Sequence, residues 1–497
     1  MQQLLTTEQM RAADQHTIRR EQITENDLID RAAGAFVSLF AVEYPDRNLA
    51  IDIYCGPGNN GADGLVIAGL LQQMDYQRLI IHLCDFDGKA QPAFLVKLEW
   101  VRKKKLTIRS LGVVSDFEAF PNGIIIEALF GSGLNKPLAR EWAELIALIN
   151  QSGAHIVSVD IPAGLPSEGV INPDWPVVEA ELVISFQRPK INFFFPESAT
   201  AINGFIIADI ELDEGFIQQQ DGVFHLVTEN DIKQIIKPRK RFSHKGTYGH
   251  ALVIAGHEDT MGAALLASSA CLYAGAGLTT AAIPSSGLTA LNTALPEVMY
   301  VPSLRLTDKA SLQSYSAIGA GPGLGKSTET LNKVSLLLDA GKPLLLDADA
   351  LNCLAQEKTL LEQIPAGTIL TPHMKEFDNL FGKHESWWER IETARDWTRR
   401  KQFVIVLKNQ YTFTINEQGK VFINPTGNPA MAQGGMGDVL SGIILALLAQ
   451  GYHPAQAAIT GCYIHGKSAD KLARCQATIR ASELAAGIPQ ILYELTK

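Results

Sequence analysis

The sequence predicts two α/β domains, each built on a largely parallel β-sheet with helices on both faces. The first observation is length, since 497 residues exceed the roughly 250 to 300 that one hydrophobic core usually serves. The second is composition, because 46% hydrophobic and 19% charged residues are typical of globular chains with enough apolar material for two cores. The third is a repeated order of short apolar segment, glycine-rich turn and helical pattern, which is typical of parallel sheets.

In the first half of the chain, this order begins at Ala50. The expected strands and their following turns read LAIDIYCGPGNNGADG, RLIIHLCD, GIIIEALFGSG, HIVSVDIPAG and ELVISF. Because strands that alternate with helices pair in parallel, we expect a Rossmann-like three-layer sandwich. We assign it to residues 1–220.

A polar, proline-containing passage after Asp213 marks the expected domain boundary, between residues 215 and 230. It offers no continuous core strand. Beyond it the alternation restarts with HALVIAG, GLTTAAIP, SAIGAGPGLG, KPLLLDAD, GTILTPH and FVIVLKNQ. A second α/β domain, with different motifs, is therefore expected over residues 225–497.

Polar residues gather at three strand ends of the first half. The turn YCGPGNNGADG leads into a helix that we expect to start near Asp63, and N–H groups at such a helix start can bind a phosphate. Glu127, before the loop GSGLNKP, and Asp160 end two further strands, which should lie beside this turn if the sheet is parallel. These features predict a ligand site. A tight connection, a charged strand end and a turn cap at Asp160 are the structural alternatives.

With these motifs, roughly residues 5–215 resemble NAD(P)HX epimerase domains, which share a GPGNNGGDG turn, a DALFGTGL loop and a DIPSG strand end. The resemblance implies that the substrates are hydrated NADH and NADPH, called NADHX and NADPHX. It implies that Asp160 is the acid/base group for the proton transfers of epimerisation. The residues implied to contact substrate are Asn59, Asn60, Gly61, Ala62, Asp63, Gly131, Ser132, Gly133, Leu134, Asn135, Lys136 and Pro137.

The same resemblance implies a potassium site at Asn60, Glu127 and Ala163. The sequence departs from the family here, with Ala62 in place of Gly, Glu127 in place of Asp and Ala163 in place of Ser. Glutamate offers oxygen to a hard cation from a longer stem, whereas Ala163 has no hydroxyl group. Potassium binding would then need a backbone carbonyl at this position.

A second glycine cluster lies near the C-terminus, in NPTGNPAMAQGGMGDVLSGIILALLAQG. Gly434, Gly435 and Gly437 precede a strongly apolar helical run. Small residues let the backbone approach a bound anion, and the helix start supplies N–H donors and a favourable dipole. Asp438, in the first helical turn, is placed to take a proton from a hydroxyl group that attacks a phosphoryl group; a capping role is the alternative.

The GMGD turn resembles the GxGD anion hole of ribokinase-like kinases, and about residues 225–490 resemble NAD(P)H-hydrate dehydratases. HKGTYGHALVIAG, MGAALLASSACLYAGAGL, GPGLG, DADALN and TPHMKEF follow in that family's order. The resemblance implies a ribokinase-like α/β fold. It also implies that ADP or ATP, with Mg²⁺, phosphorylates the hydroxyl group of the hydrated ring, after which phosphate leaves and the double bond returns.

This resemblance also assigns residues to the two ligands of the second site. Asp438 would be the catalytic base, and Ala263, Gly323 and His373 would contact the hydrated substrate. The segment KNQYT departs from the family's KGAGT, so it carries side chains where small residues normally admit the nucleotide. The residues implied to hold the adenine nucleotide are Lys408, Asn409, Gln410, Tyr411, Thr412, Gly434, Gly435 and Gly437.

Net charge and cysteine usage limit the partners and the cellular location that we expect. A net charge of −10 disfavours nucleic acid as a partner. Six scattered cysteines, without a CxxC pair or a signal peptide, predict reduced thiols in a cytoplasmic protein. Without an apolar run of about 18 residues, no membrane association is expected. A homo-oligomer is expected.

Two alternatives stay open for function. The second domain could be a ribokinase-like kinase that releases a stable phosphorylated small molecule. The first could be a non-catalytic binding or scaffold domain.

Overall fold

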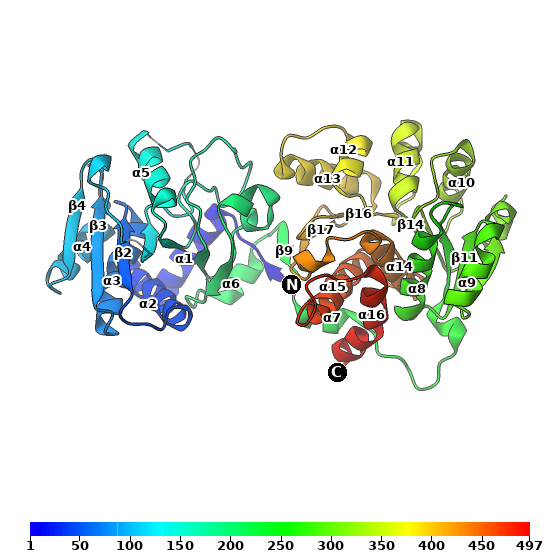
Figure 1. The fold of residues 1–497 in the computed structure, drawn as a ribbon, viewed down its shortest axis with the longest axis horizontal. Coiled ribbons are helices and arrows are strands. Elements are labelled where there is room, and N and C mark those ends of the chain that lie inside the picture. The colour runs from blue at the N-terminus through cyan, green and yellow to red at the C-terminus, as the bar shows by residue number, and fades with distance from the viewer. Residues whose placement is uncertain (87, 121, 135, 139) are drawn as a thin grey trace. The chain divides into compact units, whose positions relative to one another are not determined.

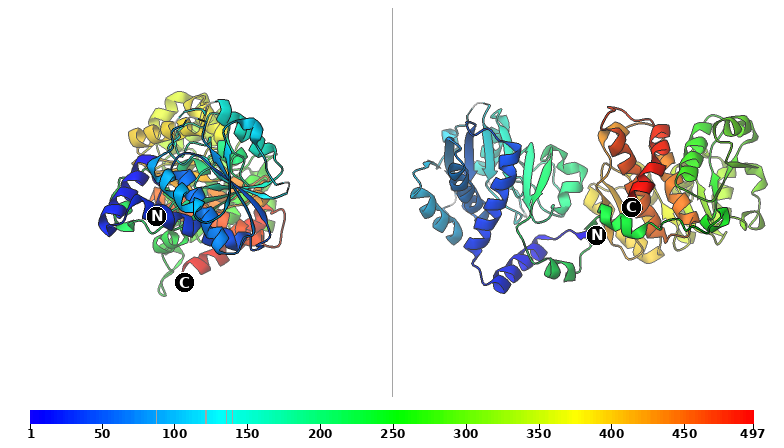
Figure 2. Two further views of the ribbon diagram at one scale, coloured as in Figure 1. Left: turned by 90° about the vertical axis from the view of Figure 1, so that its left-hand side faces the viewer. Right: turned by 90° about the horizontal axis from the view of Figure 1, so that it is seen from below.

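The chain folds into two compact units in the computed structural model, which describes residues 1–86, 88–120, 122–134, 136–138 and 140–497 (Figures 1 and 2). The first unit contains residues 3–222 and 386–388. The second contains residues 1–2, 223–385 and 389–497.

The first unit is built on a seven-stranded sheet in the order β4-β3-β2-β5-β6-β7-β8, with every neighbouring pair parallel. The strands are β2 (Ala50–Cys55), β3 (Arg78–Cys84), β4 (Thr107–Leu111), β5 (Ile124–Ala128), β6 (His155–Val159), β7 (Leu182–Phe186) and β8 (Phe205–Ala208). The helices are α1 (Thr7–Glu21), α2 (Glu25–Glu43), α3 (Asn59–Gln73), α4 (Pro92–Arg102), α5 (Arg140–Gln151) and α6 (Glu214–Gln219). The predicted parallel α/β arrangement is confirmed.

Helix α3 starts at Asn59, four residues before the expected start at Asp63. The glycines around it serve close packing, since a Cβ placed on Gly61 would lie 1.8 Å from the carbonyl oxygen of Gly56. Gly61 is therefore required inside the first helical turn and does not mark a loop. As a result, Asn60 and Asp63 both belong to the helix start.

The second unit is built on an 11-stranded sheet in the order β1-β9-β18-β17-β16-β15-β14-β13-β10-β11-β12. The strands from β10 to β16 pair in parallel, whereas β16, β17 and β18 are antiparallel. Their bounds are β1 (Gln2–Gln3), β9 (Phe224–Leu226), β10 (His250–Ile254), β11 (Leu278–Ile283), β12 (Met299–Pro302), β13 (Ala317–Ala320), β14 (Leu344–Leu346), β15 (Ile369–Leu370), β16 (Val404–Leu407), β17 (Thr412–Ile415) and β18 (Val421–Asn424).

Helices cover both faces of this sheet, with α10 to α13 on one side and α8, α14, α15 and α16 on the other (Figure 1). Their bounds are α7 (Glu229–Ile235), α8 (Met261–Tyr273), α9 (Leu288–Ala294), α10 (Thr328–Leu338), α11 (Ala348–Gln356), α12 (Met374–Phe381), α13 (Trp387–Lys401), α14 (Met436–Ala449), α15 (Pro454–Leu472) and α16 (Ala481–Leu495). Helix α14 is buried along nearly its whole length and packs against α8. This burial holds the predicted glycine turn at a rigid helix start.

Across the described residues, no helix combines the length and the apolar character needed to cross a bilayer.

Candidate active sites

In the first unit, the turn after β2 and the loop after β5 are locked together. A Cβ placed on Gly56 would lie 2.0 Å from the carbonyl oxygen of Leu129, so only glycine permits this approach. The Asn60 amide Nδ2 donates to the carbonyl oxygen of Phe130 at 2.8 Å. The structure thus brings together two of the three strand ends that the sequence singled out.

Asp160, at the third strand end, is held in a strained position by a lysine. Its φ of +67° is unusual for a residue with a side chain. Its Oδ1 lies 2.6 Å from Lys190 Nζ and accepts the Phe186 N–H at 3.0 Å. Lys190 is almost fully buried, so this contact fixes the position of the Asp160 carboxyl group at the end of β6.

Two more carboxyl groups, Asp63 and Asp14, surround Asp160. Burial raises the pKa of Asp63 well above its ordinary value, and the charges of Asp160 and Asp14 raise it further. Burial also raises the pKa of Asp14, to about 6. The site therefore places the side chain that Lys190 holds near two carboxyl groups with raised pKa values, an arrangement that suits acid/base chemistry. Asp14 and Lys190 were not predicted from the sequence.

Glu127 does not present its carboxylate for a potassium ion. Oε1 accepts the Leu129 N–H at 2.8 Å, while Oε2 accepts the Ser158 hydroxyl at 2.7 Å and the Ala163 N–H at 3.2 Å. Burial raises the pKa of Glu127 to about 7. Among the described residues, Asn60 Oδ1 is a buried oxygen without a hydrogen-bond partner. The Ala163 N–H donates to the Glu127 carboxylate, so Asn60, Glu127 and Ala163 do not fit the potassium site that the family resemblance implies.

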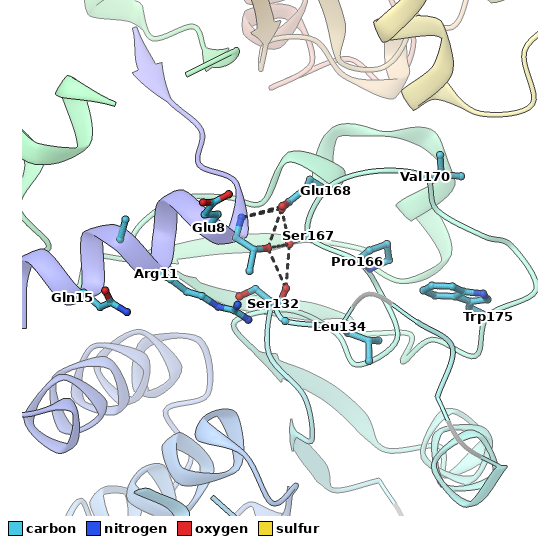
Figure 3. Close-up of a pocket in the computed structure, with 13 residues that line it drawn as sticks. Glu8, Arg11, Gln15, Ser132, Leu134, Pro166, Ser167, Glu168, Val170 and Trp175 are labelled. Carbon is cyan, nitrogen blue, oxygen red and sulfur yellow. Dashed lines mark hydrogen bonds between the residues drawn. The ribbon is translucent and has the colours of Figure 1, made fainter. Parts of the chain in front are cut away.

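A cavity of about 770 Å³ opens beside the loop after β5 (Figure 3). This volume is typical of small-ligand sites. Three of the predicted residues, Ser132, Gly133 and Leu134, line it. The other lining residues are Thr7, Glu8, Arg11, Ala12, Gln15, Pro166, Ser167, Glu168, Val170 and Trp175.

Arg11 gives this cavity a positive group. Its guanidinium extends from α1 toward the Ser132–Leu134 loop, and a Cβ placed on Gly133 would lie 2.8 Å from Arg11 Nη2 (Figure 3). Across the described part of the chain, it forms no ion pair. Trp175 stands beyond Leu134 and supplies an aromatic surface (Figure 3). An unpaired guanidinium and an indole suit an anionic ligand that carries aromatic rings.

The other predicted residues of the first unit lie around this cavity or outside it. Asn59, Gly61 and Ala62 belong to the start of α3, with Gly61 and Ala62 buried. Gly131 is half-buried, whereas Lys136 and Pro137 are exposed. Asn135 lies outside the described residues.

In the second unit, the start of α14 faces a lysine held between carboxylates. Gly435 caps the helix with φ +88°, and Asp438 lies in its first turn, as predicted. Lys408 Nζ donates to Asp347 Oδ1 at 2.9 Å, and the Ser441 hydroxyl donates to Asp347 Oδ2 at 2.7 Å. A Cβ placed on Gly437 would lie 3.5 Å from Lys408 Nζ. The Gly437 backbone, which carries no side chain, therefore lies close to the Lys408 ammonium group.

The charges of this cluster suit a base and a phosphate-binding cation. Burial and then Asp347 raise the pKa of Asp438 to about 6, against the opposing effect of Lys408. Burial lowers the pKa of Lys408, but the carboxylates of Asp347, Glu376 and Asp438 outweigh it and the pKa is raised. Lys408 thus stays charged, and Asp438 titrates close to neutrality. Asp347 and Ser441 were not predicted, although Asp347 opens the motif DADALN at a strand end.

The three residues expected to contact the hydrated substrate differ in their surroundings. Ala263 and Gly323 are neighbours, since a Cβ placed on Gly323 would lie 3.0 Å from the Ala263 Cβ. His373 caps α12, where its Nδ1 accepts the N–H groups of Lys375 at 3.1 Å and Glu376 at 3.3 Å. His373 therefore has a structural role at this helix start, and its side chain is still 52% exposed.

A cavity of about 420 Å³ lies beside the start of α14. Of the residues expected to hold the adenine nucleotide, Lys408, Asn409, Gln410, Thr412 and Gly437 line it. Tyr411, Gly434 and Gly435 are not among its lining residues in the described structure. The remaining lining residues are Asn424, Thr426, Gly427, Asn428, Pro429, Met431, Ala432, Met436, Leu440, Cys462, His465 and Gly466.

Comparison with known proteins identifies both halves. A family model described as NAD(P)H-hydrate dehydratase matches residues 251–490, and one described as YjeF-related protein N-terminus matches residues 25–192. A ribokinase-like superfamily protein from Enterococcus faecalis, 26% identical with a TM-score of 0.50, covers 55% of this chain and 96% of its own. This confirms the predicted ribokinase-like fold of the second half.

Two relatives extend over nearly the whole chain. The proteins of Moorella thermoacetica and Coxiella burnetii are both named bifunctional NAD(P)H-hydrate repair enzymes, and both are 32% identical to this chain. The first alignment covers 90% of this chain and 88% of the relative, and the second covers 91% of each. The chain therefore belongs to the family of bifunctional NAD(P)H-hydrate repair enzymes.

Proposed function

We propose that this chain repairs NADHX and NADPHX by epimerising them in residues 1–220 and dehydrating the S epimer, at the expense of ADP or ATP, in residues 225–497. The observation that carries the proposal is the convergence of Asp438, the bare Gly437 backbone and Lys408 at the start of α14. A base beside amide donors and a cation is the arrangement that phosphoryl transfer needs.

In the dehydration step, Asp438 removes the proton from the hydroxyl group of the hydrated ring. The resulting oxygen attacks the terminal phosphorus of the nucleotide, a new O–P bond forms, and ADP or AMP leaves. Lys408 and the amides of Gly435 and Gly437 stabilise the charge on the transferred group. The electron pair of the ring nitrogen then expels phosphate, and a ring proton is lost as the double bond returns.

The residues of the second site fit a Mg²⁺ ion that arrives with the nucleotide. The described residues hold no cluster of three or more His, Cys, Asp or Glu side chains that could hold a metal ion, so they supply no complete metal cage of their own. Mg²⁺ is commonly held by substrate phosphates, water and only one or two carboxylates. The carboxylates of this cluster are Asp347 and Asp438, and the ion would neutralise phosphate charge.

In the epimerisation step, Asp160 and its partners exchange the proton that opens and recloses the hydrated ring. Lys190 holds Asp160 in place at 2.6 Å, and Asp14 and Asp63, with raised pKa values, supply the complementary acid. Arg11 would bind a phosphate of the substrate, and Trp175 would face one of its rings. No potassium ion takes part in this scheme.

An assay of the purified chain with a mixture of NADHX epimers and ADP or ATP tests the proposal. Recovery of the dihydronicotinamide absorbance is expected for both epimers. A stable phosphorylated product without that absorbance would support the kinase alternative. Turnover that stops when only the R epimer is supplied would leave the first unit as a scaffold. A cytoplasmic location and a homo-oligomeric state stay predictions from the sequence.

A further inference from the structure

Four polar residues of the first unit form one hydrogen-bonded cluster in the wall of the cavity of about 770 Å³ (Figure 3). They are Thr7, at the start of α1, Ser132, in the loop after β5, and Ser167 and Glu168, in the loop after β6. The hydroxyl groups of Thr7 and Ser167 lie 2.7 Å apart, and they approach the Ser132 carbonyl oxygen to 3.2 and 3.3 Å. We call these four residues the Glu168 cluster.

The Glu168 carboxylate ties the start of α1 to the loop after β6. Both of its oxygens accept the Thr7 N–H at 3.1 Å, and Oε2 also accepts the Ser167 hydroxyl at 2.8 Å. Thr7 is the first residue of α1, so its N–H has no partner within the helix. The helix dipole adds to this hydrogen bond, because it favours a negative charge at a helix N-terminus.

Helix α1 has few apolar side chains that could fix its position. Of its 15 residues, Ala13 and Thr17 are the buried ones. The C-terminal half is attached to Asp213, whose N–H donates to Thr17 Oγ1 at 3.0 Å and whose carboxylate pairs with Arg20. The N-terminal half is attached through the Glu168 cluster, so this cluster sets where that half of the helix lies.

Arg11 lies one turn after Thr7, on the same face of α1, because residues i and i+4 are neighbours on a helix. Its guanidinium extends toward the loop that the Glu168 cluster also binds, since a Cβ placed on Gly133 would lie 2.8 Å from Arg11 Nη2 (Figure 3). A shift at the start of α1 would therefore move the guanidinium relative to the Ser132–Leu134 loop.

We propose that Glu168 is a positioning residue for epimerisation, which holds the Thr7 N–H and thereby fixes the Arg11 guanidinium where it binds a phosphate of the substrate. The inference rests on the proposed function of the first unit. A cation that is already in place strengthens binding, because less conformational freedom is lost when the ligand arrives. The effect of Glu168 should therefore fall on KM.

Thr7→Pro breaks the Glu168 cluster and keeps the helix. Proline has neither an N–H nor a hydroxyl group, and it is favoured at the first position of a helix. Thr6, with ψ of 164°, already has the extended backbone that a residue before proline prefers. In Thr7→Pro and in Glu168→Ala, KM for R-NADHX should rise about five- to tenfold, while kcat stays within about twofold of wild type.

A double variant with Arg11→Gln separates positioning from direct contact with the substrate. Because Glu168 acts through Arg11, adding Glu168→Ala to Arg11→Gln should raise KM by less than about twofold further. Additive increases in KM would mean that Glu168 contacts the substrate itself, and would overturn the proposal. Glu179→Gln is the matched control, since this exposed carboxylate lies near the other end of the loop after β6, and it should leave KM unchanged.

An unchanged KM in both single variants, or a fall in kcat alone, would also overturn the proposal. If the variants do not fold, amide hydrogen exchange of the wild-type protein by NMR decides. The Thr7 N–H should then exchange at least about tenfold more slowly than the Glu8 N–H, the next amide of the first turn, and equal rates would overturn the proposal. A wild-type chain without epimerase activity defeats the proposed function, whereas epimerisation with an unaltered KM in both variants defeats only the role of Glu168.

Discussion

The two sites hold their charges in different ways. In the first unit, one lysine pairs with Asp160 while Asp14 and Asp63 keep raised pKa values. In the second, Lys408 is shared among several carboxylates beside a bare helix start. Carboxyl groups with raised pKa values suit proton transfer, whereas a cation beside free amides suits a phosphoryl group. The difference indicates which chemistry each unit supports.

In both sites, a residue at or next to an aspartate has a strained backbone conformation. Asp160 itself has φ +67°, and Ala348, which follows Asp347, has φ +45°. Side-chain-bearing residues adopt such angles at a cost that the surrounding structure must offset. In both units, therefore, the end of a parallel strand is bent to aim a carboxylate at a particular partner.

The largest expected effect is on Asp438. In Asp438→Asn the base is lost while shape is kept, so dehydration of S-NADHX should fall at least about a hundredfold. Nucleotide affinity by calorimetry should stay within a few-fold of wild type, and epimerisation should not change. Dehydration within about tenfold of wild type, a difference of about 1.4 kcal/mol, would show that Asp438 is not the base.

The second prediction concerns Asp160, in the first unit. Asp160→Asn removes the carboxylate that Lys190 holds, so epimerisation of R-NADHX should slow by about a hundredfold. Dehydration of the S epimer should keep its wild-type rate, measured in the same preparation. A parallel loss of both activities would point to misfolding, and an unchanged epimerisation rate would remove Asp160 from the mechanism.

The sequence predicted these two aspartates because each follows a strand end or a glycine turn, positions where side chains meet ligands in α/β folds. It could not indicate Arg11, Asp14 or Lys190. Arg11 and Asp14 lie on α1, whose pattern is that of an ordinary surface helix, and only tertiary folding brings that helix over the strand ends. Such residues lack any local signal, since their partners lie far along the chain: Lys190 pairs with Asp160, and Arg11 approaches Gly133.

In the fold, too, elements with a clear local sequence pattern were predictable and the others were not. The parallel strands with buried apolar runs were predictable, and their Rossmann-like and ribokinase-like arrangement is confirmed. Strands β1 and β9, with two and three residues, were not, because so short a segment carries no periodicity. Helix α3 starts earlier than predicted because Gly61, a residue type typical of turns, lies within the helix, where it packs closely against Gly56.

A third prediction concerns substrate binding in the first unit. Arg11→Gln should raise KM for epimerisation by about tenfold with little change in kcat, because a hydrogen bond to a charged group contributes about 1.5 to 3 kcal/mol. Arg19→Gln, on the exposed side of the same helix, is the control and should leave KM unchanged. If kcat falls and KM does not, Arg11 does not bind the ground-state substrate.

The smallest expected effect is that of replacing potassium on the rate of epimerisation. Because Glu127 gives both carboxylate oxygens to Ser158, Leu129 and Ala163, the epimerisation rate should change less than about twofold when K⁺ is replaced by a bulky organic cation at equal ionic strength. The double variant Glu127→Asp/Ala163→Ser restores a shorter carboxylate and a hydroxyl group beside the unpartnered Asn60 Oδ1, and its rate should become dependent on K⁺. Strong K⁺ dependence in the wild-type protein would mean that the carboxylate of Glu127 exchanges its internal donors for the ion when substrate binds.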